Sequence, residues 1–300
     1  MKRHGRTLGT AAGALVLTGL VGACGSGTPS AGATAAGVPA VPGGGDAASG
    51  TAGGSASGSA PAAGSASAQA AAWARWGLTP LPAAPAPPAD RPIKLTRTGK
   101  VPVIKQVPTG QKVVFITVDD GAEKDPTFIR MMQDLKVPIT MFLMNDTIKN
   151  DYGYFKPLQA LGNSIQNHTL HHPAMNTVSE ARQRQEVCGD QQILTREYGA
   201  APYLFRPPYG AGAYSAELNS AVQACGPRAI VYWDETMEIT GLEYQTPDRK
   251  LRDGDIILAH FRGPSELKGE SMTAMFANLL KRIHEQGFAV ARLDDYIQRP

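Results

Sequence analysis

Residues 113–121 restrict the fold of this chain more than any other stretch. An apolar, β-branched run that starts at Val113 ends abruptly in Asp119, Asp120 and Gly121. Such a run is typical of a strand buried on both faces. Two adjacent carboxylates without partners are costly to bury, so we expect them at the rim where the strand ends. In α/β folds this rim carries the functional sites. The alternative is that Asp-Gly is only a turn that ends the strand.

The composition divides the chain into two parts. Much of the glycine, alanine and proline lies in the first third of the 300 residues, whereas charged and aromatic residues lie mostly after Arg91. This division predicts one folded domain of about two hundred residues, at 93–300. Within that domain strands and helices alternate, which predicts a parallel sheet, either open or closed into a barrel.

The expected elements follow from apolar periodicity, caps and breakers. Short pieces between Ile93 and Gly110, broken by prolines, predict one or two edge strands. Further strands are predicted at 137–144, 164–167, 202–205, 228–233, 255–259 and 288–292, and helices at 126–136, 152–161, 180–198, 216–224 and 272–286.

Residues 1–23 have the pattern of an export signal, with a positively charged start and an apolar core at 8–21. That core is too short for a comfortable membrane span. It ends in Leu-Val-Gly-Ala before Cys24, which resembles the lipobox of bacterial lipoproteins, where the cysteine receives the lipid. Two acyl chains on Cys24 would hold the protein on the outer face of the cytoplasmic membrane. An ordinary signal peptide with a chance cysteine is the alternative.

Residues 24–92 consist mostly of Ala, Gly, Ser and Pro, with almost no charge. Such a segment cannot bury enough surface to offset its ordering entropy, so it is predicted to be a disordered tether. Trp73 and Trp76 could dock on the domain or on another surface. A chance pair of aromatic residues is the simpler interpretation, and no function is assigned to them.

Residues suited to proton transfer or metal binding follow several predicted strands. His168 and His172 are four residues apart, so on a helical turn both imidazoles could face one point. Two histidines and a carboxylate are a common ligand set for catalytic Zn²⁺. Arg206 could pair bidentately with a rim carboxylate, and His260 ends a buried strand. Taken singly, these features are also explained by a surface histidine cluster, a proline turn with a solvated arginine, and a packed histidine.

Taken together, these segments resemble the NodB-homology polysaccharide deacetylases (carbohydrate esterase family 4) in their order and spacing. The resemblance covers 112–297, and four motifs in order make it specific. It implies a distorted (β/α) barrel with fewer than eight strands and a single catalytic domain. The matching segments are Thr-Val-Asp-Asp-Gly at 117–121, His-Thr-Leu-His-His-Pro at 168–173, Arg-Pro-Pro-Tyr at 206–209 and Ile-Ile-Leu-Ala-His at 256–260.

The resemblance also implies a ligand set and a base. Asp120, His168 and His172 would bind a divalent metal, usually Zn²⁺, with Co²⁺, Ni²⁺ or Mn²⁺ as the other candidates. Asp119 would be the general base that deprotonates the attacking water, and Arg206 would orient it. The physics is coherent, because a metal makes water nucleophilic near neutral pH.

Further roles follow from the same resemblance. The backbone N–H of Tyr209 would stabilise the tetrahedral oxyanion. His260, protonated near neutral pH, would be the acid that protonates the departing amine. Leu258 and Pro207 would line the pocket for the substrate, with Leu258 at the acetyl methyl group.

The fourth motif of the family is not reproduced after Trp233. The carboxylate that tunes the acid histidine could be Asp234, Glu235 or Glu238, and the sequence does not decide among them. This departure from the family motif affects the expected choice of substrate more than the expected hydrolytic reaction. His171 is extra, and we interpret it as either a neighbour of the ligands or a solvated residue.

Cys188 and Cys225 each lie on a predicted helix of an exported domain or at the end of one. One structural disulfide is the favoured interpretation, and two buried free thiols are the alternative.

The predicted activity is removal of acetyl groups from N-acetylated glycans, with peptidoglycan as the leading substrate because of the surface location alone. An O-acetyl esterase and a non-catalytic glycan-binding lipoprotein are the alternatives, and the chain has no His-Glu-x-x-His motif of a metalloprotease. Loss of the export signal would leave 26 basic and 26 acidic residues, so nucleic acid is not expected as a partner. We expect a monomer.

Overall fold

A computed structural model describes residues 63–264 and 266–300 of the chain. The predicted signal peptide at 1–23, Cys24 and the first part of the predicted tether lie outside these residues. None of the described helices is both long enough and apolar enough to cross a membrane.

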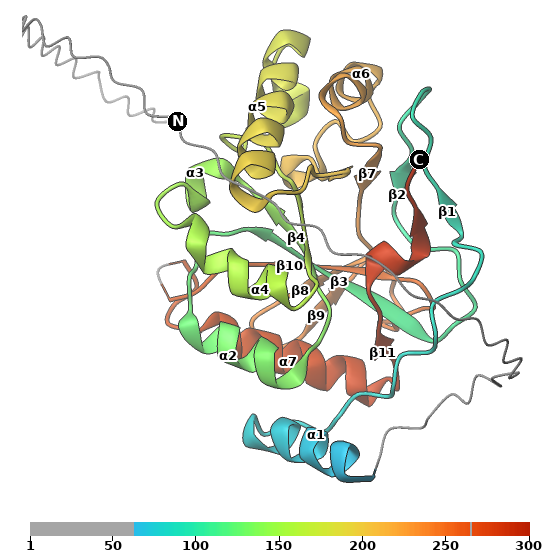
Figure 1. Ribbon diagram of the computed structural model, residues 1–300, viewed down its shortest axis with the longest axis vertical. Coiled ribbons are helices and arrows are strands. Elements are labelled where there is room, and N and C mark those ends of the chain that lie inside the picture. The colour runs from blue at the N-terminus through green and yellow to red at the C-terminus, as the bar shows by residue number, and fades with distance from the viewer. Residues whose placement is uncertain (1–62, 265) are drawn as a thin grey trace, which may run out of the picture. The chain divides into compact units, whose positions relative to one another are not determined.

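Ten strands form one curled sheet, with β3 (Val113–Asp120) near its centre (Figure 1). The order is β2-β7-β6-β5-β4-β3-β10-β8-β9, β11 also pairs with β3, and only the β8–β9 pair of this sheet is antiparallel. A separate parallel pair joins β1 to β12. The remaining strands are β1 (Ile93–Lys94), β2 (Val103–Ile104), β4 (Thr140–Leu143), β5 (Ser164–Asn167), β6 (Leu204–Phe205), β7 (Ala229–Val231), β8 (Glu235–Met237), β9 (Leu242–Tyr244), β10 (Ile256–His260), β11 (Ala289–Val290) and β12 (Ile297–Gln298).

The sheet confirms the predicted α/β class and the distorted barrel. It has more strands than the fewer than eight that the family resemblance implied, because short strands such as β2 and β9 extend its edges and β11 pairs with the start of β3. The β8–β9 hairpin was not predicted. Its strands are three residues long, and the sequence after Trp233 lacks a continuous apolar run.

The β3 strand is buried on both faces, as its apolar sequence predicts. Val114 and Ile116 belong to the core formed with helices α2 (Pro126–Leu135) and α7 (Met272–Glu285), whereas Phe115 belongs to the core on the opposite face. Because side chains alternate along a strand, Thr117 and Asp119 share the inner face of the sheet with Phe115. This alternation directs one carboxylate of the pair into the barrel.

The helices begin at the capping residues that the sequence predicts. Asp125 accepts a hydrogen bond from the backbone N–H of Thr127 at the start of α2, and Ser179 caps α5, which ends at the left-handed Gly199. The helices are α1 (Ala63–Arg75), α2 (Pro126–Leu135), α3 (Asn145–Ile148), α4 (Lys156–Ala160), α5 (Glu180–Tyr198), α6 (Ala216–Cys225) and α7 (Met272–Glu285), with 3-10 turns at Tyr152–Phe155, Met175–Thr177, Pro208–Gly210 and Leu293–Tyr296.

The disulfide predicted between Cys188 and Cys225 forms in the structure, where the two Cα atoms are 4.7 Å apart. It joins α5 to α6, which lie side by side in Figure 1. Because α5 also packs on β5, the bond fixes the helices that cover one side of the candidate site.

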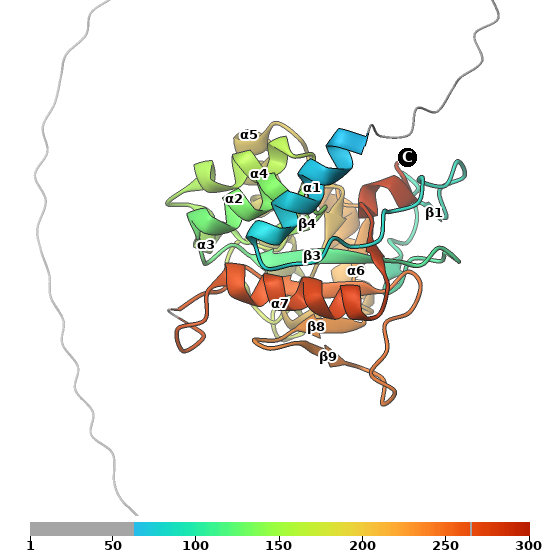
Figure 2. The same ribbon diagram turned by 90° about the horizontal axis from the view of Figure 1, so that it is seen from below.

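The prediction of a disordered tether up to residue 92 is wrong for its last part. Residues 63–75 form α1, which packs on α2 (Figure 2). Trp73 is only 4% exposed, and Trp76 Nε1 donates a hydrogen bond to Asp134 Oδ2 at 2.9 Å. The buried Trp73 and the partly buried Trp76 provide the apolar area that offsets the ordering of a segment otherwise made of small residues. The folded part of the chain therefore includes the segment from Ala63.

Candidate metal centre and catalytic site

The carboxyl ends of four parallel strands carry the residues singled out by the sequence. Asp119 and Asp120 end β3, and the loop with His168 follows β5 directly. Arg206 follows β6, and His260 is the last residue of β10. Since β3 pairs with both β4 and β10, and β5 lies between β4 and β6, these ends meet at one rim.

The backbone at this rim is locally strained. Seven described non-glycine residues have positive φ, and four of them lie here: Asp120 (71°), Thr169 (78°), His172 (59°) and Tyr209 (59°). Left-handed conformations cost free energy for such residues and cluster at functional sites. The strained turn at Asp120 separates its side chain from that of Asp119. Gly121 is required next, because a Cβ atom there would lie 2.5 Å from Ile148 Cγ2.

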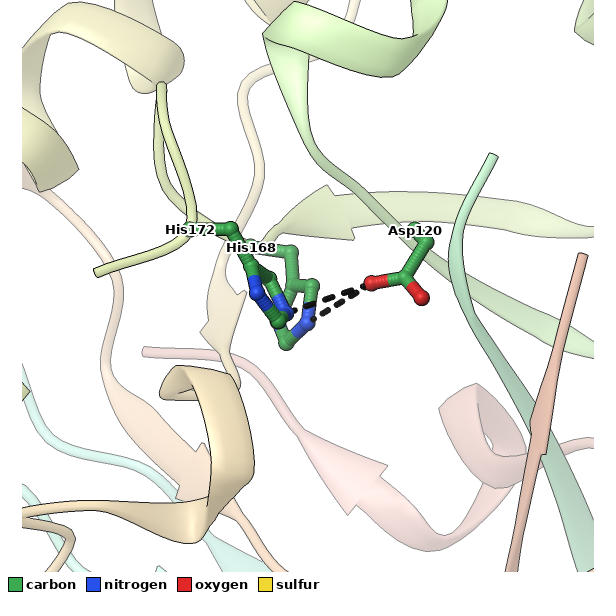
Figure 3. A group of neighbouring side chains, drawn as sticks. All are labelled: Asp120, His168 and His172. Atoms are coloured by element: carbon green, nitrogen blue, oxygen red, sulfur yellow. Dashed lines mark ion pairs between the residues drawn. The ribbon is translucent and has the colours of Figure 1, made fainter. Parts of the chain in front are cut away.

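Asp120, His168 and His172 point toward one another (Figure 3). Asp120 Oδ1 is 3.5 Å from His168 Nε2 and 3.3 Å from His172 Nε2. Ligand bonds of about 2.1 Å in a tetrahedral site place the ligand atoms about 3.4 Å apart, so these separations fit a bound Zn²⁺. Asp120 Oδ1 is also buried without a hydrogen-bond partner. A buried carboxylate oxygen facing two imidazoles is well suited to a cation.

The histidines are not on a helical turn, contrary to the expectation from their spacing. Residues 168–172 form an irregular loop whose conformation is set by buried carboxylates of α5. Glu186 accepts hydrogen bonds from the backbone N–H groups of Leu170 and His171, and Asp190 accepts one from His168. His168 Nδ1 lies 2.7 Å from the backbone oxygen of Arg206, which leaves Nε2 free to face Asp120.

The Asp120 carboxylate and the His168 imidazole shift each other's pKa values. Burial alone would raise the pKa of Asp120, but the imidazoles of His168 and His172, 3.5 and 3.3 Å from Oδ1, outweigh it and hold this pKa well below its usual range. Burial alone would lower the pKa of His168, yet the neighbouring Asp119 and Asp120 raise it. The two histidines are thus held among negative charge that a metal would neutralise.

Asp119 is held by a buried arginine. Arg206 Nη1 donates to Asp119 Oδ1 at 2.7 Å and to Thr117 Oγ1 at 2.7 Å, and the guanidinium is fully buried. Its remaining donors reach the backbone oxygens of Val231 and Tyr232. The contact with the carboxylate is through one nitrogen, not the bidentate pair that the sequence suggested. A charge-assisted bond of this kind fixes Asp119 Oδ1 and leaves Oδ2 available.

His260 lies beside Asp119, its register partner across the β10–β3 pair. Burial lowers the pKa of His260 to about 4, against the expectation that it is protonated near neutral pH. A histidine with this pKa is neutral at pH 7 in the resting site, so it would have to receive a proton during turnover before it could donate one.

Two of the three carboxylates considered as partners of His260 interact elsewhere. Asp234 forms an ion pair with Lys105 at 3.2 Å. Glu235 lies near Asp255, and burial together with the charges of Asp255 and Asp234 raises its pKa to about 9. Glu238 lines a cavity of about 80 Å³ together with His260.

Three site residues were missed by the sequence interpretation. Arg262 Nη2 is 3.5 Å from Asp120 Oδ2, and Glu186 and Asp190 are the fully buried carboxylates that hold the histidine loop. No sequence pattern indicated Arg262. The only signal for Glu186 and Asp190 was their four-residue spacing, which puts the two acids on one face of α5. His171, the extra histidine, is directed to Glu186 at 3.0 Å.

The remaining predicted residues lie near the rim. Leu258 is buried on β10 opposite Thr117, and on the same face as His260. Pro207 and Tyr209 follow Arg206 in a tight turn, and the Tyr209 ring contacts His172 edge-on at 4.7 Å between centroids.

Comparison with protein families and relatives points to one family. A family model described as "Polysaccharide deacetylase" matches residues 106–230. An uncharacterized protein of Streptomyces coelicolor is 37% identical over 214 residues, which are 71% of this chain and 82% of that protein. A peptidoglycan-N-acetylglucosamine deacetylase of Bacillus cereus is 23% identical over 206 residues, covering 64% of this chain and 92% of the relative.

Solved structures share the fold at low identity. A family 4 carbohydrate esterase from Bacillus anthracis is 21% identical with a TM-score of 0.52, over 67% of this chain and 97% of that chain. BA3943, a pseudoenzyme of the same family and species, is 19% identical with a TM-score of 0.53, over 66% of this chain and 70% of that chain. The fold therefore occurs both with and without activity, and the site residues must distinguish the two.

Proposed function

Because this chain belongs to the polysaccharide deacetylase family, we propose that it is a metal-dependent hydrolase that removes N-acetyl groups from a cell-wall glycan, with peptidoglycan as the leading substrate. The observation that carries the proposal is the rim itself. There an unpartnered oxygen of Asp120 faces His168 and His172, beside an Asp119 held by Arg206.

The chain's own residues divide the hydrolysis into proton transfers and charge stabilisation. A divalent metal bound by Asp120, His168 and His172 would supply Lewis-acid polarisation of a water and of the acetyl carbonyl. Asp119 would accept the proton of the attacking water as a new C–O bond forms. The backbone N–H of Tyr209, in its left-handed turn, would donate to the oxyanion.

The second half of the reaction breaks the C–N bond. The departing nitrogen needs a proton, and His260 is placed to deliver it beside Asp119. Because the resting His260 is neutral at pH 7, the proton that Asp119 takes from water would pass to the nitrogen through His260. The products are acetic acid, which then ionises to acetate in solution, and the free amine, and both the Asp119 carboxylate and the His260 imidazole return to their starting forms.

The substrate assignment is supported by the relatives. The Bacillus cereus relative is a peptidoglycan-N-acetylglucosamine deacetylase, and a "Peptidoglycan-N-acetylmuramic acid deacetylase" of Bacillus subtilis is 22% identical over 201 residues, which are 63% of this chain and 39% of that protein. An exported enzyme on a tether would meet the same polymer.

The test is acetate release by the metal-loaded protein from N-acetylglucosamine oligomers, beside O-acetylated xylan. We expect release from the N-acetylated oligomers. Release only from xylan would establish an O-acetyl esterase instead, and no release from either substrate by protein with bound metal would favour the non-catalytic glycan-binding alternative.

The ligand set predicts which histidine controls metal content. We expect His168→Ala to lose bound metal, because it removes one of three ligands from a buried site. His171→Ala is the matched control, since His171 lies three residues away and is directed to Glu186; we expect at most about tenfold weaker binding. Metal content after dialysis, measured by atomic emission, checks both. Equal metal in His168→Ala and the parent protein would overturn the ligand assignment.

The location is proposed from the first 24 residues. Lipidation of Cys24 would hold the mature protein on the outer face of the cytoplasmic membrane, and the part of the tether before Ala63 would extend it toward the wall. We expect Cys24→Ala to move the protein from the membrane fraction to the medium, because the variant has no thiol to receive the lipid. Persistence in the membrane fraction would contradict the lipid anchor.

A further inference from the structure

Two tyrosines are the only large apolar side chains that the described residues leave widely exposed. Tyr209 is 71% exposed and Tyr214 is 68% exposed. Both belong to the segment between β6 and α6, next to the candidate metal centre. Scattered surface aromatics need no explanation, but two exposed rings five residues apart beside a catalytic rim suggest a binding role.

The rings are held in place by other aromatic residues. The Tyr214 ring lies 6.1 Å from that of Tyr232, which stacks on Trp233 at 4.3 Å with an interplanar angle of 13°. Trp233 in turn lies over the buried guanidinium of Arg206, 5.6 Å from its centre. Exposed Tyr214 is thereby backed by a layer that reaches the residue holding Asp119.

Gly210 allows this layer to approach the site. A Cβ atom at Gly210 would lie 2.5 Å from Tyr232 Cε2, so only a glycine admits the ring so close to the turn that carries Tyr209. Tyr232 is thus packed between that turn and Tyr214. Tyr232 therefore lies close to both Tyr214 and Gly210, and the ring of Tyr209, which precedes Gly210, contacts His172.

The chemistry of this surface favours a sugar chain. Pyranose rings present apolar C–H faces, and the flat apolar ring of a tyrosine matches such a face. Preordered rings lose little conformational entropy on binding, because the tyrosine side chain has two rotatable torsions.

We propose that Tyr214, backed by Tyr232, is a stacking site for sugar rings that neighbour the reacting one in an N-acetylated oligosaccharide. The proposal rests on the proposed function and deepens it. The protein would then select chains over single sugars or dimers, through binding rather than through the chemical step.

The test compares Tyr214→Ala with Tyr214→Phe, which keeps the ring and removes only the hydroxyl. Michaelis constants would be measured with N-acetylglucosamine oligomers of two to six units and the metal-loaded protein. We expect Tyr214→Ala to raise KM for the longest oligomers by about three- to tenfold, with kcat and the dimer's KM unchanged. Tyr214→Phe should resemble the parent protein in both constants.

A binding measurement separates this proposal from the proposed activity. Calorimetric titration of the hexamer into Asp119→Asn protein, with and without Tyr214→Ala, requires no turnover, and Tyr214→Ala should weaken binding by the same factor. Unchanged affinity and unchanged length dependence would overturn the stacking site while acetate release by the parent protein still supports the deacetylase. An equal effect of Tyr214→Ala on dimer and hexamer would also overturn it, because the ring would then act at the reacting sugar or on the fold.

Discussion

Replacement of Asp119 by Asn is expected to reduce kcat by about 10²- to 10⁴-fold while bound metal is retained. The amide has nearly the shape of the carboxylate but cannot accept the proton of the attacking water. Asp120 Oδ1, not Asp119, faces both histidines, so the ligand set remains complete. Acetate release and metal content, measured on the same preparation, check the two halves of this prediction.

Asp120→Asn is the matched control, because it makes the same chemical change at the adjacent residue. We expect it to weaken metal binding, since a ligand carboxylate becomes a neutral amide. The two variants should therefore differ in metal content even if both lose activity. Retained activity in Asp119→Asn would contradict its role as the base, and equal metal loss in both variants would contradict the division of roles between the aspartates.

Replacement of Arg206 by Met is expected to lower the free energy of unfolding by about 3–5 kcal/mol, in addition to abolishing activity. Arg206 is fully buried and pairs with Asp119, which is only 2% exposed. Without the guanidinium, the Asp119 carboxylate would be left as an uncompensated buried charge, and Thr117 Oγ1 would lose a donor. Urea denaturation of the variant and parent proteins measures the difference.

A double variant tests the cause. In the Asp119→Asn background, Arg206→Met should cost less than in the parent protein, because no buried carboxylate charge is left behind. Arg262→Met is the matched surface control: Arg262 also faces an aspartate, but its side chain is 38% exposed, so we expect a change of about 1 kcal/mol or less. An equal cost of Arg206→Met in both backgrounds would show that packing, rather than the ion pair, sets the stability.

Much of the fold could be predicted because local signals agreed with the tertiary structure. Asp125, Ser179 and Ser271 cap the helices predicted after them, and the β3 strand ends at the two carboxylates. The α1 helix, by contrast, was not predicted. The helix α1 forms because Trp73 finds a partner surface on α2, and its own composition gave no reason to expect one.

In the site, too, the residue types could be predicted, whereas several of their tertiary contacts could not. The residue types and their order along the chain indicated the chemistry, because each of them ends a strand or directly follows one: Asp119, Asp120, His168, Arg206 and His260. The sequence could not show that Asp190 positions the histidine loop from an α5 helix twenty-two residues away, or that Arg262 reaches Asp120. Such contacts depend on the path of the backbone between the elements, which no local pattern encodes.

By itself, the sequence determined that a buried strand delivers two carboxylates to the rim of a parallel sheet, since apolar periodicity and the cost of burying charge act locally. Only the tertiary structure decided what distinguishes the two. The left-handed turn at Asp120 directs one oxygen to His168 and His172, while strand alternation directs Asp119 inward to Arg206. It also decided that His260 is neutral at rest, because a pKa depends on the burial and charges that surround a group after folding.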